Sequence, residues 1–148
     1  MIELWRLEPV EPDIKPLVDA LNTVEGVEII ASCQGHKWVD GHRQWLPRAE
    51  PYVAFSGPTC FAAELEMYIR HDADSDEPIL RWHPWRVSAY FDTQFKLIFA
   101  LRGQFSGFWP HNRSRLRRDL MLLCQFVRRA AQMGNGYHPM NMSFTNIA

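Results

Sequence analysis

The chain has 148 residues, the usual size of a single folded domain, and its 47% hydrophobic and 22% charged residues exclude a disordered or fibrous protein. Its net charge of −1 excludes a general electrostatic attraction to nucleic acid or to an anionic membrane, so any such attraction must be local. The acidic, proline-containing start and the lack of a long apolar run predict neither export nor membrane insertion. The odd set of cysteines, Cys33, Cys60 and Cys124, predicts free thiols and therefore a cytoplasmic protein.

Apolar spacing and turn residues divide the chain into strands and helices. The predicted elements, in chain order, are a strand at 2–7, a helix at 13–25, strands at 27–31 and 51–56, a helix at 59–71, strands at 85–91 and 95–102, and a helix at 114–133. Because only Asp92-Thr93-Gln94 separates the last two strands, we expect them to form an antiparallel hairpin.

Residues with known capping preferences mark the ends of the predicted helices. Asp13 can cap the first helix, and Gly26 suits the turn that follows it. Thr59 can cap the second helix, with Pro58 just outside it. Gly134 can end the third.

The resulting order, β-α-β-β-α-β-β-α, predicts an α+β fold of two layers. We expect a mixed or antiparallel sheet of about five strands, with three helices on one of its faces. Residues 1–134 are expected to form a single domain, and the aperiodic residues 135–148 a loosely ordered C-terminal tail.

The segment Ser32-Cys33-Gln34-Gly35-His36, at the carboxyl end of a predicted strand, is the best candidate for a working site. An imidazole three residues from a sulfur could activate the thiol, so Ser32, Cys33 and His36 are the candidate catalytic residues. Gln34 and Gly35 are candidate ligand-binding residues, and Gly35 could supply a positive φ angle or let a ligand approach the backbone. The alternative is that Cys33 is a packed small side chain and His36 a loop residue.

A metal site is a second hypothesis for the same segment. Cys33, His36 and His42 form a C-x2-H-x5-H series, which could bind zinc if Cys60 or His83 supplied a fourth ligand. The sequence has no second pair at the usual spacing of a structural zinc site.

Residues 36–50 lack a clean period and predict a long loop, and long loops in compact domains are often functional. Trp38 and His42 in this loop are candidate ligand contacts. The tryptophans that could stack on bases or rings, with core packing as the alternative, are Trp38, Trp45, Trp82, Trp85 and Trp109.

Arginines gather on and just before the third predicted helix, away from its leucine stripe. Arg113, Arg117 and Arg128 are the candidate phosphate contacts. The alternative is a solvated basic face, balanced by Asp119 and by the acidic loop at 72–78.

With Gly26-Val27-Glu28 before it and Pro51-Tyr52-Val53-Ala54-Phe55 after it, the motif at 32–36 resembles that of small bacterial and phage proteins of unknown function with a Ser-Cys-x-Gly-His element. This resemblance covers about the first third of the chain. The Ser-Cys-x-Gly part is also similar to the Ser-Cys-Ser-Gly-Arg element of the wybutosine-synthesis family of tRNA-modifying methyltransferases. His36 stands here in place of that family's arginine. The resemblance implies that residues 32–36 line a site.

Two functions follow as hypotheses. In the first, a ligand or active site at 32–42 acts on nucleic acid or a nucleotide, with Cys33 as thiolate or ligand and His36 as acid, base or ligand. In the second, the protein is a noncatalytic module, a homodimer or a binder of protein or nucleic acid. That module would use the aromatic loop 36–50 and the basic face of the helix at 112–133, with Cys33 merely packed.

Overall fold

A computed structural model describes residues 10–35, 50–80, 84–103 and 113–135. The described elements are α1 (Lys15–Asn22), β1 (Glu28–Cys33), β2 (Tyr52–Ser56), α2 (Thr59–Ala73), β3 (Trp85–Phe91), β4 (Leu97–Gly103) and α3 (Arg113–Asn135). They confirm the α+β class, and each of them coincides with a predicted segment to within a few residues. The predicted strand at 2–7 and residues 136–148 of the predicted tail lie outside the described residues.

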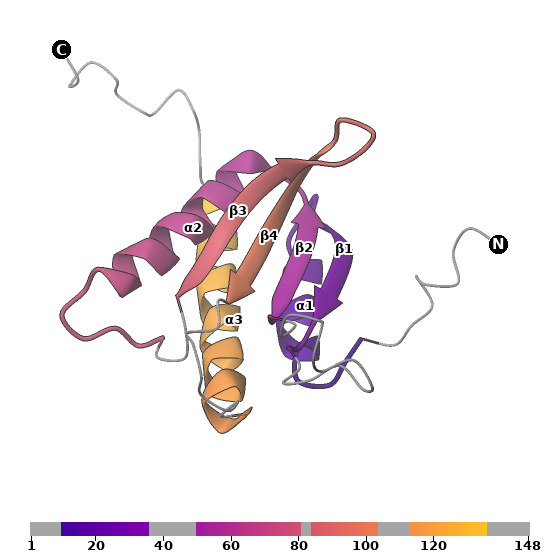
Figure 1. The fold of residues 1–148 in the computed structure, drawn as a ribbon. Helices are drawn as coiled ribbons and strands as arrows, with labels where there is room; N and C mark the ends of the chain where they lie inside the picture. Colours follow the sequence, from indigo (N-terminus) through magenta and orange to yellow (C-terminus); the bar gives the residue numbers. More distant parts are fainter. Residues whose placement is uncertain (1–9, 36–49, 81–83, 104–112, 136–148) are drawn as a thin grey trace, which may run out of the picture.

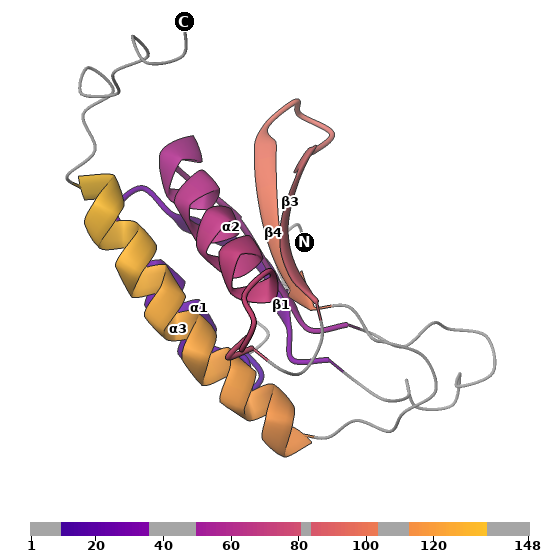
Figure 2. The same ribbon diagram turned by 90° about the vertical axis from the view of Figure 1, so that its left-hand side faces the viewer.

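The described sheet is antiparallel throughout, with the strand order β1-β2-β4-β3 (Figure 1). The described sheet has four strands rather than about five. The other predicted strand, at 2–7, lies outside the described residues. β1 pairs with β2 through an irregular register between Ile29 and Ala31. The three described helices lie on one side of the sheet, and no described helix covers its other face, called here the helix-free face (Figure 2).

The core lies between the helices and one face of the sheet. Val53, Phe55, Phe99 and Leu101 point from the two central strands into this layer. The ring of Phe55 lies 5.9 Å from that of Phe61 on α2 and 5.7 Å from that of Phe99, measured between centroids. The apolar stripe of α3 fills the other side with Leu116, Leu120, Leu123, Cys124 and Val127, as its helical spacing predicts.

The β3–β4 hairpin is confirmed, although its turn is longer than the sequence predicts. Asp92 accepts backbone hydrogen bonds from Gln94 and Lys96 through its side chain, and its own N–H donates to the carbonyl of Lys96. These bonds draw Phe95, which has a φ of +64°, into the turn, so β4 begins at Leu97 rather than at residue 95.

Two of the predicted helix caps are wrong. Asp13 does not cap α1, because the N-cap residue is Ile14 and the Asp13 carboxylate is engaged by Arg117 of α3. Thr59 is the first residue of α2 rather than its cap, and Pro58 occupies the cap position. Within the described segments, no helix combines the length and the apolar content needed to span a bilayer.

Candidate functional site

Gln34, which follows β1, makes hydrogen bonds to residues just before α1. Its side-chain Oε1 accepts a hydrogen bond from the backbone N–H of Asp13 at 2.9 Å. In return, its own backbone N–H donates to Glu11 Oε1 at 3.1 Å. Gln34, predicted to bind a ligand, thus has a structural role in this pair of bonds.

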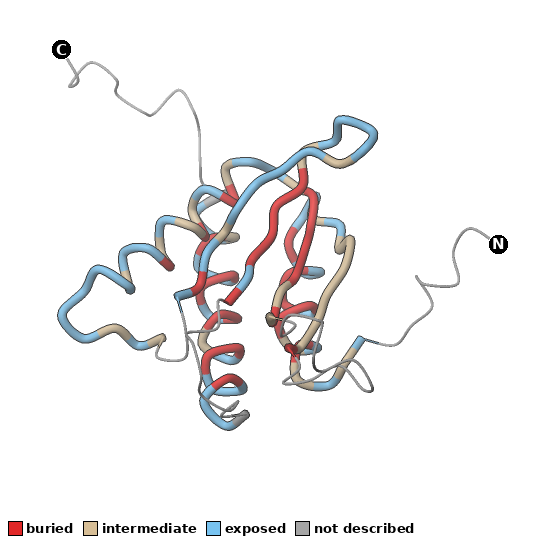
Figure 3. The backbone as a smooth tube through the Cα atoms, in the orientation of Figure 1, coloured by how far each residue is buried: buried red, intermediate tan, exposed pale blue. Residues whose placement is uncertain are grey.

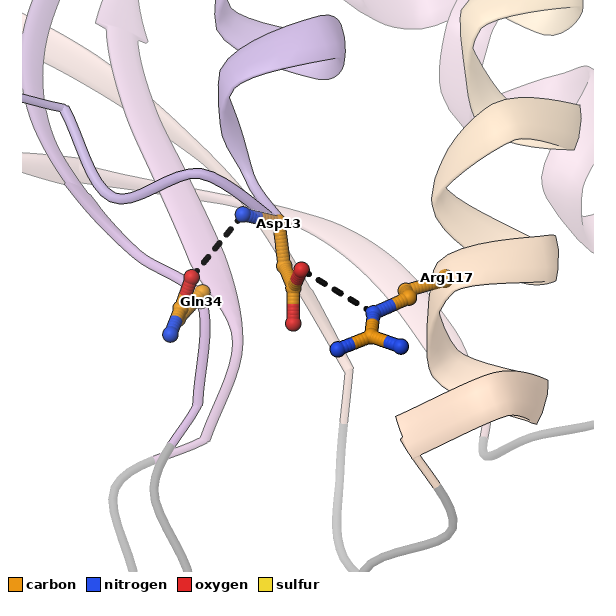
Figure 4. A network of polar contacts seen from close by, with 3 residues as sticks. All are labelled: Asp13, Gln34 and Arg117. Atoms are coloured by element: carbon orange, nitrogen blue, oxygen red, sulfur yellow. Dashed lines mark hydrogen bonds and ion pairs between the residues drawn. The ribbon is translucent and has the colours of Figure 1, made fainter.

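Arg117 reaches the same place from the opposite side. Its Nε donates to Asp13 Oδ1 at 3.1 Å, so Gln34, Asp13 and Arg117 form one chain of polar contacts (Figure 4). The Asp13 side chain is 15% exposed and that of Arg117 is 61% exposed, so one edge of the guanidinium is left to solvent. Residues 32–35 of the motif and Arg117, near the start of α3, therefore lie at one end of the molecule.

Arg128 does not join this group. It lies 11 residues beyond Arg117 on α3 (128 − 117), which at about 1.5 Å per residue places it roughly 16 Å further along the helix axis. The predicted phosphate contacts Arg117 and Arg128 therefore cannot meet one phosphate. Arg113 is the first residue of α3.

Gly35 is buried and has a φ of +84°, so the structure shows the first of the two roles considered for it, a positive φ angle. A Cβ atom at this position would lie 3.0 Å from Cδ and 3.1 Å from the backbone N of Pro51, the residue just before β2. The group that lies too close to Gly35 to allow a side chain is thus Pro51 of the same chain.

Ser32 and Cys33 point to opposite faces of the sheet, because neighbouring residues of a strand alternate. Ser32 pairs with Val53, whose side chain is in the core, so Ser32 lies on the helix side. Cys33 pairs with Tyr52 on the helix-free side, and its Sγ accepts a hydrogen bond from the N–H of Gly35 at 3.4 Å. The structure therefore separates these two candidate catalytic side chains.

Cys33 begins a line of polar and aromatic side chains that crosses the sheet. Tyr52 pairs with Cys33 on one side and with Arg102 on the other, and Arg102 pairs with Arg86. Residues that pair directly share a face, so these four side chains, called here the terminal row, all lie on the helix-free face. Sequence reasoning missed Tyr52, Arg86 and Arg102. Strand alternation could have placed Tyr52 opposite the core-facing Val53, but it could not have supplied the partners.

The terminal row lies at the strand ends from which several connecting segments begin. It lies where β1 and β4 end and where β2 and β3 begin, which is also the end of the molecule where α3 starts (Figure 1). The segments 36–49, 81–83 and 104–112 leave the described structure from these strand ends. His36, Trp38 and His42 belong to the first of them and lie outside the described residues.

The rest of the helix-free face differs from the terminal row. The next row inward contains small residues, in the order Ala31, Ala54, Ala100 and Ser88. Ala54, Ala100 and the neighbouring Ile98 are nearly inaccessible, whereas Arg86 and Arg102 are exposed and Tyr52 and Cys33 are half-buried (Figure 3). The accessible polar chemistry of this face therefore lies in its terminal row.

Electrostatics keep the Tyr52 phenol protonated. Burial raises the pKa of Tyr52 above its ordinary value of 10.0, and Cys33 and Tyr90 raise this pKa further. Arg102 lowers the same pKa and Glu11 raises it, both by less than burial does. At neutral pH Tyr52 is therefore a neutral ring with a hydroxyl that can donate a hydrogen bond.

The structure decides two alternatives left open by the sequence. Trp85 packs in the core rather than offering a ring to a ligand, and its Nε1–H donates to Asp119 Oδ2 at 3.0 Å. Asp119 is itself fully buried, so it does not balance a solvated basic face as the alternative for α3 supposed. For zinc, the described residues contain no group of three His, Cys, Asp or Glu side chains placed to hold a metal, and His36 and His42 are not among them.

We expect the cysteines to react with a thiol reagent in an order set by burial. Cys33 and Cys60 are half-buried, whereas Cys124 is buried and its thiol donates to the carbonyl of Leu120 at 3.2 Å. Burial also raises the pKa of Cys124 above its ordinary value of 9.0, which further disfavours a reactive thiolate at this position in the folded protein.

Peptide mass spectrometry over a time course would measure these rates. Cys124 should react about a hundredfold or more slowly than Cys33, since it must await an opening of the fold. Labelling in denaturant, where all three thiols should react alike, is the control. Equal rates at Cys33 and Cys124 in the native protein would contradict the burial described here.

Comparisons of the chain with protein-family models, with curated proteins and with solved structures find no match, so the site described here rests on the geometry of this chain.

Proposed function

We propose that the protein binds single-stranded nucleic acid at the terminal row, with a base stacked on Tyr52 and a phosphate held by Arg102. The observation that carries this proposal is the pairing of Cys33 with Tyr52 and of Tyr52 with Arg102 on the face without helices. Proteins bind single strands by combining aromatic rings, on which bases stack, with cations that follow the backbone. Known RNA-binding modules use the free face of a four-stranded antiparallel sheet in this way.

The charges along the row support a phosphate contact. Among the described residues, Glu50 is the carboxylate neighbour of Arg102, with its Oε2 at 3.8 Å from Arg102 Nη2, and half of the Arg102 side chain is exposed. Such a loose, exposed pair contributes little, so a phosphate oxygen can replace the carboxylate. Arg86 is exposed and makes no ion pair with any described residue, and it extends the positive charge to the edge of the sheet. With a net charge of −1, any attraction to nucleic acid must be local, and Arg86 and Arg102 supply such a local positive patch.

The raised pKa of Tyr52 supports the stacking role. A neutral phenol presents an uncharged ring to a base and avoids repulsion between a phenolate and the nucleic acid phosphates. The hydroxyl can also donate a hydrogen bond to a base edge or to a phosphate oxygen. Tyr52 therefore offers both a stacking surface and a polar contact.

The test is the affinity of the purified protein for a fluorescein-labelled single-stranded oligonucleotide of mixed sequence, followed by fluorescence anisotropy at low salt. Tyr52→Ala should weaken binding about tenfold, because stacking on an aromatic ring contributes about 1–3 kcal/mol per base. Tyr52→Phe, which keeps the ring, should retain most of the affinity. Arg102→Gln should weaken binding and make the slope of log K against log salt shallower by about 0.7.

Arg70→Gln is the matched control, since Arg70 is an exposed arginine on α2, paired with Glu66 and away from the terminal row. Thermal unfolding of each variant separates lost affinity from lost structure. Unchanged affinity in both Tyr52→Ala and Arg102→Gln, or an equal loss in Arg70→Gln, would refute the proposal. Binding of a mononucleotide as tight as that of the oligonucleotide would restrict the ligand to a nucleotide.

Cys33→Ser separates an enzyme from a binding module at the same site. Cys33 is the nucleophilic side chain of the terminal row, so an enzyme that acts on the bound base through a thiol would bind but not turn over without it. If Cys33→Ser keeps full affinity and the native thiol labels slowly, the noncatalytic module is favoured.

A further inference from the structure

β3 is an outer strand whose free edge is accessible. It pairs with β4 along one side, and no described residue pairs with it along the other. Ser88, Ala89, Tyr90 and Phe91 are exposed, and the strand is pale along most of its length in Figure 3. An outer strand of this kind carries unpaired N–H and C=O groups that can bind another strand.

Two backbone hydrogen bonds identify the residues whose backbone groups face this free edge. Gly103 donates its N–H to Pro51, on the β2 side, so it directs its backbone away from its β3 partner Trp85. At the other end of the hairpin, Asp92 donates to Lys96, which makes that pair a hydrogen-bonded one. Because hydrogen-bonded and non-hydrogen-bonded pairs alternate in an antiparallel ladder, the residues facing outward are Trp85, Val87, Ala89 and Phe91.

The two outer strands of the sheet differ in how far they resist such pairing. Each outer strand has a charged residue near its start, Glu28 in β1 and Arg86 in β3, but of the two only β1 has a register irregularity, between Ile29 and Ala31, which hinders the addition of a strand. From Val87 to Phe91, β3 has no charge, no proline and no register shift. The edge of β3 is therefore open to pairing where that of β1 is blunted.

We propose that β3 pairs antiparallel with β3 of a second copy of this chain, about a two-fold axis at Ser88. Only outward-facing residues can exchange hydrogen bonds, and centring the pair on Ser88 matches Val87 with Ala89 and Trp85 with Phe91 of the second copy. Because Trp85 is buried, the accessible hydrogen-bonded pairs of this register are the two between Val87 and Ala89, and they join the two sheets into one.

The side chains favour the same register. It sets Arg86 opposite Tyr90 of the second copy, twice by symmetry, in pairs where side chains approach most closely. Both side chains are exposed in the single chain and both lie on the helix-free face, so a guanidinium can lie over a phenol ring. The second copy thus offers Arg86 an aromatic partner without neutralising its charge.

Cysteine cross-linking tests the register. Ser88→Cys would place two thiols in a non-hydrogen-bonded pair with Cα atoms about 4.5 Å apart, within the range of about 4.4–6.8 Å that a disulfide spans. Mild oxidation should therefore convert most of this variant into a dimer linked between the two residues at position 88, as identified by peptide mass spectrometry. Ala89→Cys is the matched control, because its two copies would lie about 9 Å apart and should not link.

Light scattering across protein concentrations, together with Ala89→Pro, tests the dimer itself. Ala89 directs its N–H outward, so proline there removes a donor to the second copy and none to β4. The full-length protein should be a dimer at high concentration, and Ala89→Pro should raise its dissociation constant about tenfold or more while circular dichroism stays unchanged.

A monomer at all concentrations would overturn the proposal, as would equal cross-linking of Ser88→Cys and Ala89→Cys. Hydrogen exchange distinguishes another occupant of the edge. In the dimer, protection of the Val87, Ala89 and Phe91 amides should rise with protein concentration. Protection of the same amides in a monomer would show that the chain covers its own edge, and would also overturn the proposal.

Discussion

Asp119→Ala is expected to lower the free energy of unfolding by about 3–4 kcal/mol, because it removes the buried acceptor that joins α3 to β3. The Asp119 carboxylate is fully buried and accepts the indole N–H of Trp85 at 3.0 Å. Truncation leaves that N–H without its acceptor in the core and leaves a cavity where the carboxylate stood. Equilibrium unfolding in urea, with the slope m compared between variants, measures the loss.

Asp119→Asn and Trp85→Phe test whether the loss of stability comes from the hydrogen bond between these two side chains. Asparagine keeps the size and one carbonyl oxygen that can accept from Trp85, so it should recover at least part of the stability that alanine loses. Trp85→Phe removes the donor and part of the buried ring, and should also destabilise. A loss below about 1 kcal/mol for Asp119→Ala would mean that this bond contributes little to the fold.

Gly35→Ala is expected to destabilise the protein by about 2–3 kcal/mol, for two reasons that add. A residue with a side chain pays about 1–2 kcal/mol for the left-handed conformation that Gly35 adopts. The new Cβ would also press on the ring and backbone of Pro51, at 3.0 and 3.1 Å, and Pro51 cannot move without shifting the start of β2. Urea unfolding again measures the change.

Gly26→Ala is the matched control for Gly35→Ala. Gly26 has nearly the same φ, +83°, but a Cβ there would meet only side-chain atoms of Pro58, at 3.3 Å. The difference between the two variants therefore isolates the close approach to Pro51. An equal decrease in the free energy of unfolding in both variants would show that the new Cβ at position 35 is accommodated beside Pro51 without further destabilisation. Full stability of Gly35→Ala with loss of nucleic acid binding would instead point to a ligand at the Gly35 backbone.

Local patterns in the chain were sufficient to predict the described helices and strands. The apolar stripe through Leu116, Leu120 and Leu123 predicts α3 because a helix repeats every 3.6 residues and this one buries a single face. The β-rich run from Trp85 to Phe91, followed at once by Asp92, predicts one arm of a hairpin. Each of these elements can therefore be predicted from its own residues, without reference to the rest of the chain.

The predictions that failed depend on partners distant in sequence. Asp13 has the right residue type for a helix cap, but Arg117, 104 residues away, binds its carboxylate. Asp119 has the right charge to balance a solvated basic face, but it is buried and accepts a hydrogen bond from Trp85, 34 residues away. Local preference is weak enough that such contacts override it.

For the candidate site, the sequence alone was enough to place the segment from Ser32 to Gly35 at the carboxyl end of a strand, although β1 extends to Cys33 and so includes the first two of these residues. It also offered a positive φ angle as one of two roles for Gly35. The neighbours of this segment depend on the tertiary structure. It placed Cys33 beside Tyr52 and Arg102, set Ser32 on the opposite face, and engaged Gln34 in holding α1. The physical reason is that backbone conformation follows from nearby residues, whereas the pairing of strands and the burial of charges depend on how the whole chain packs.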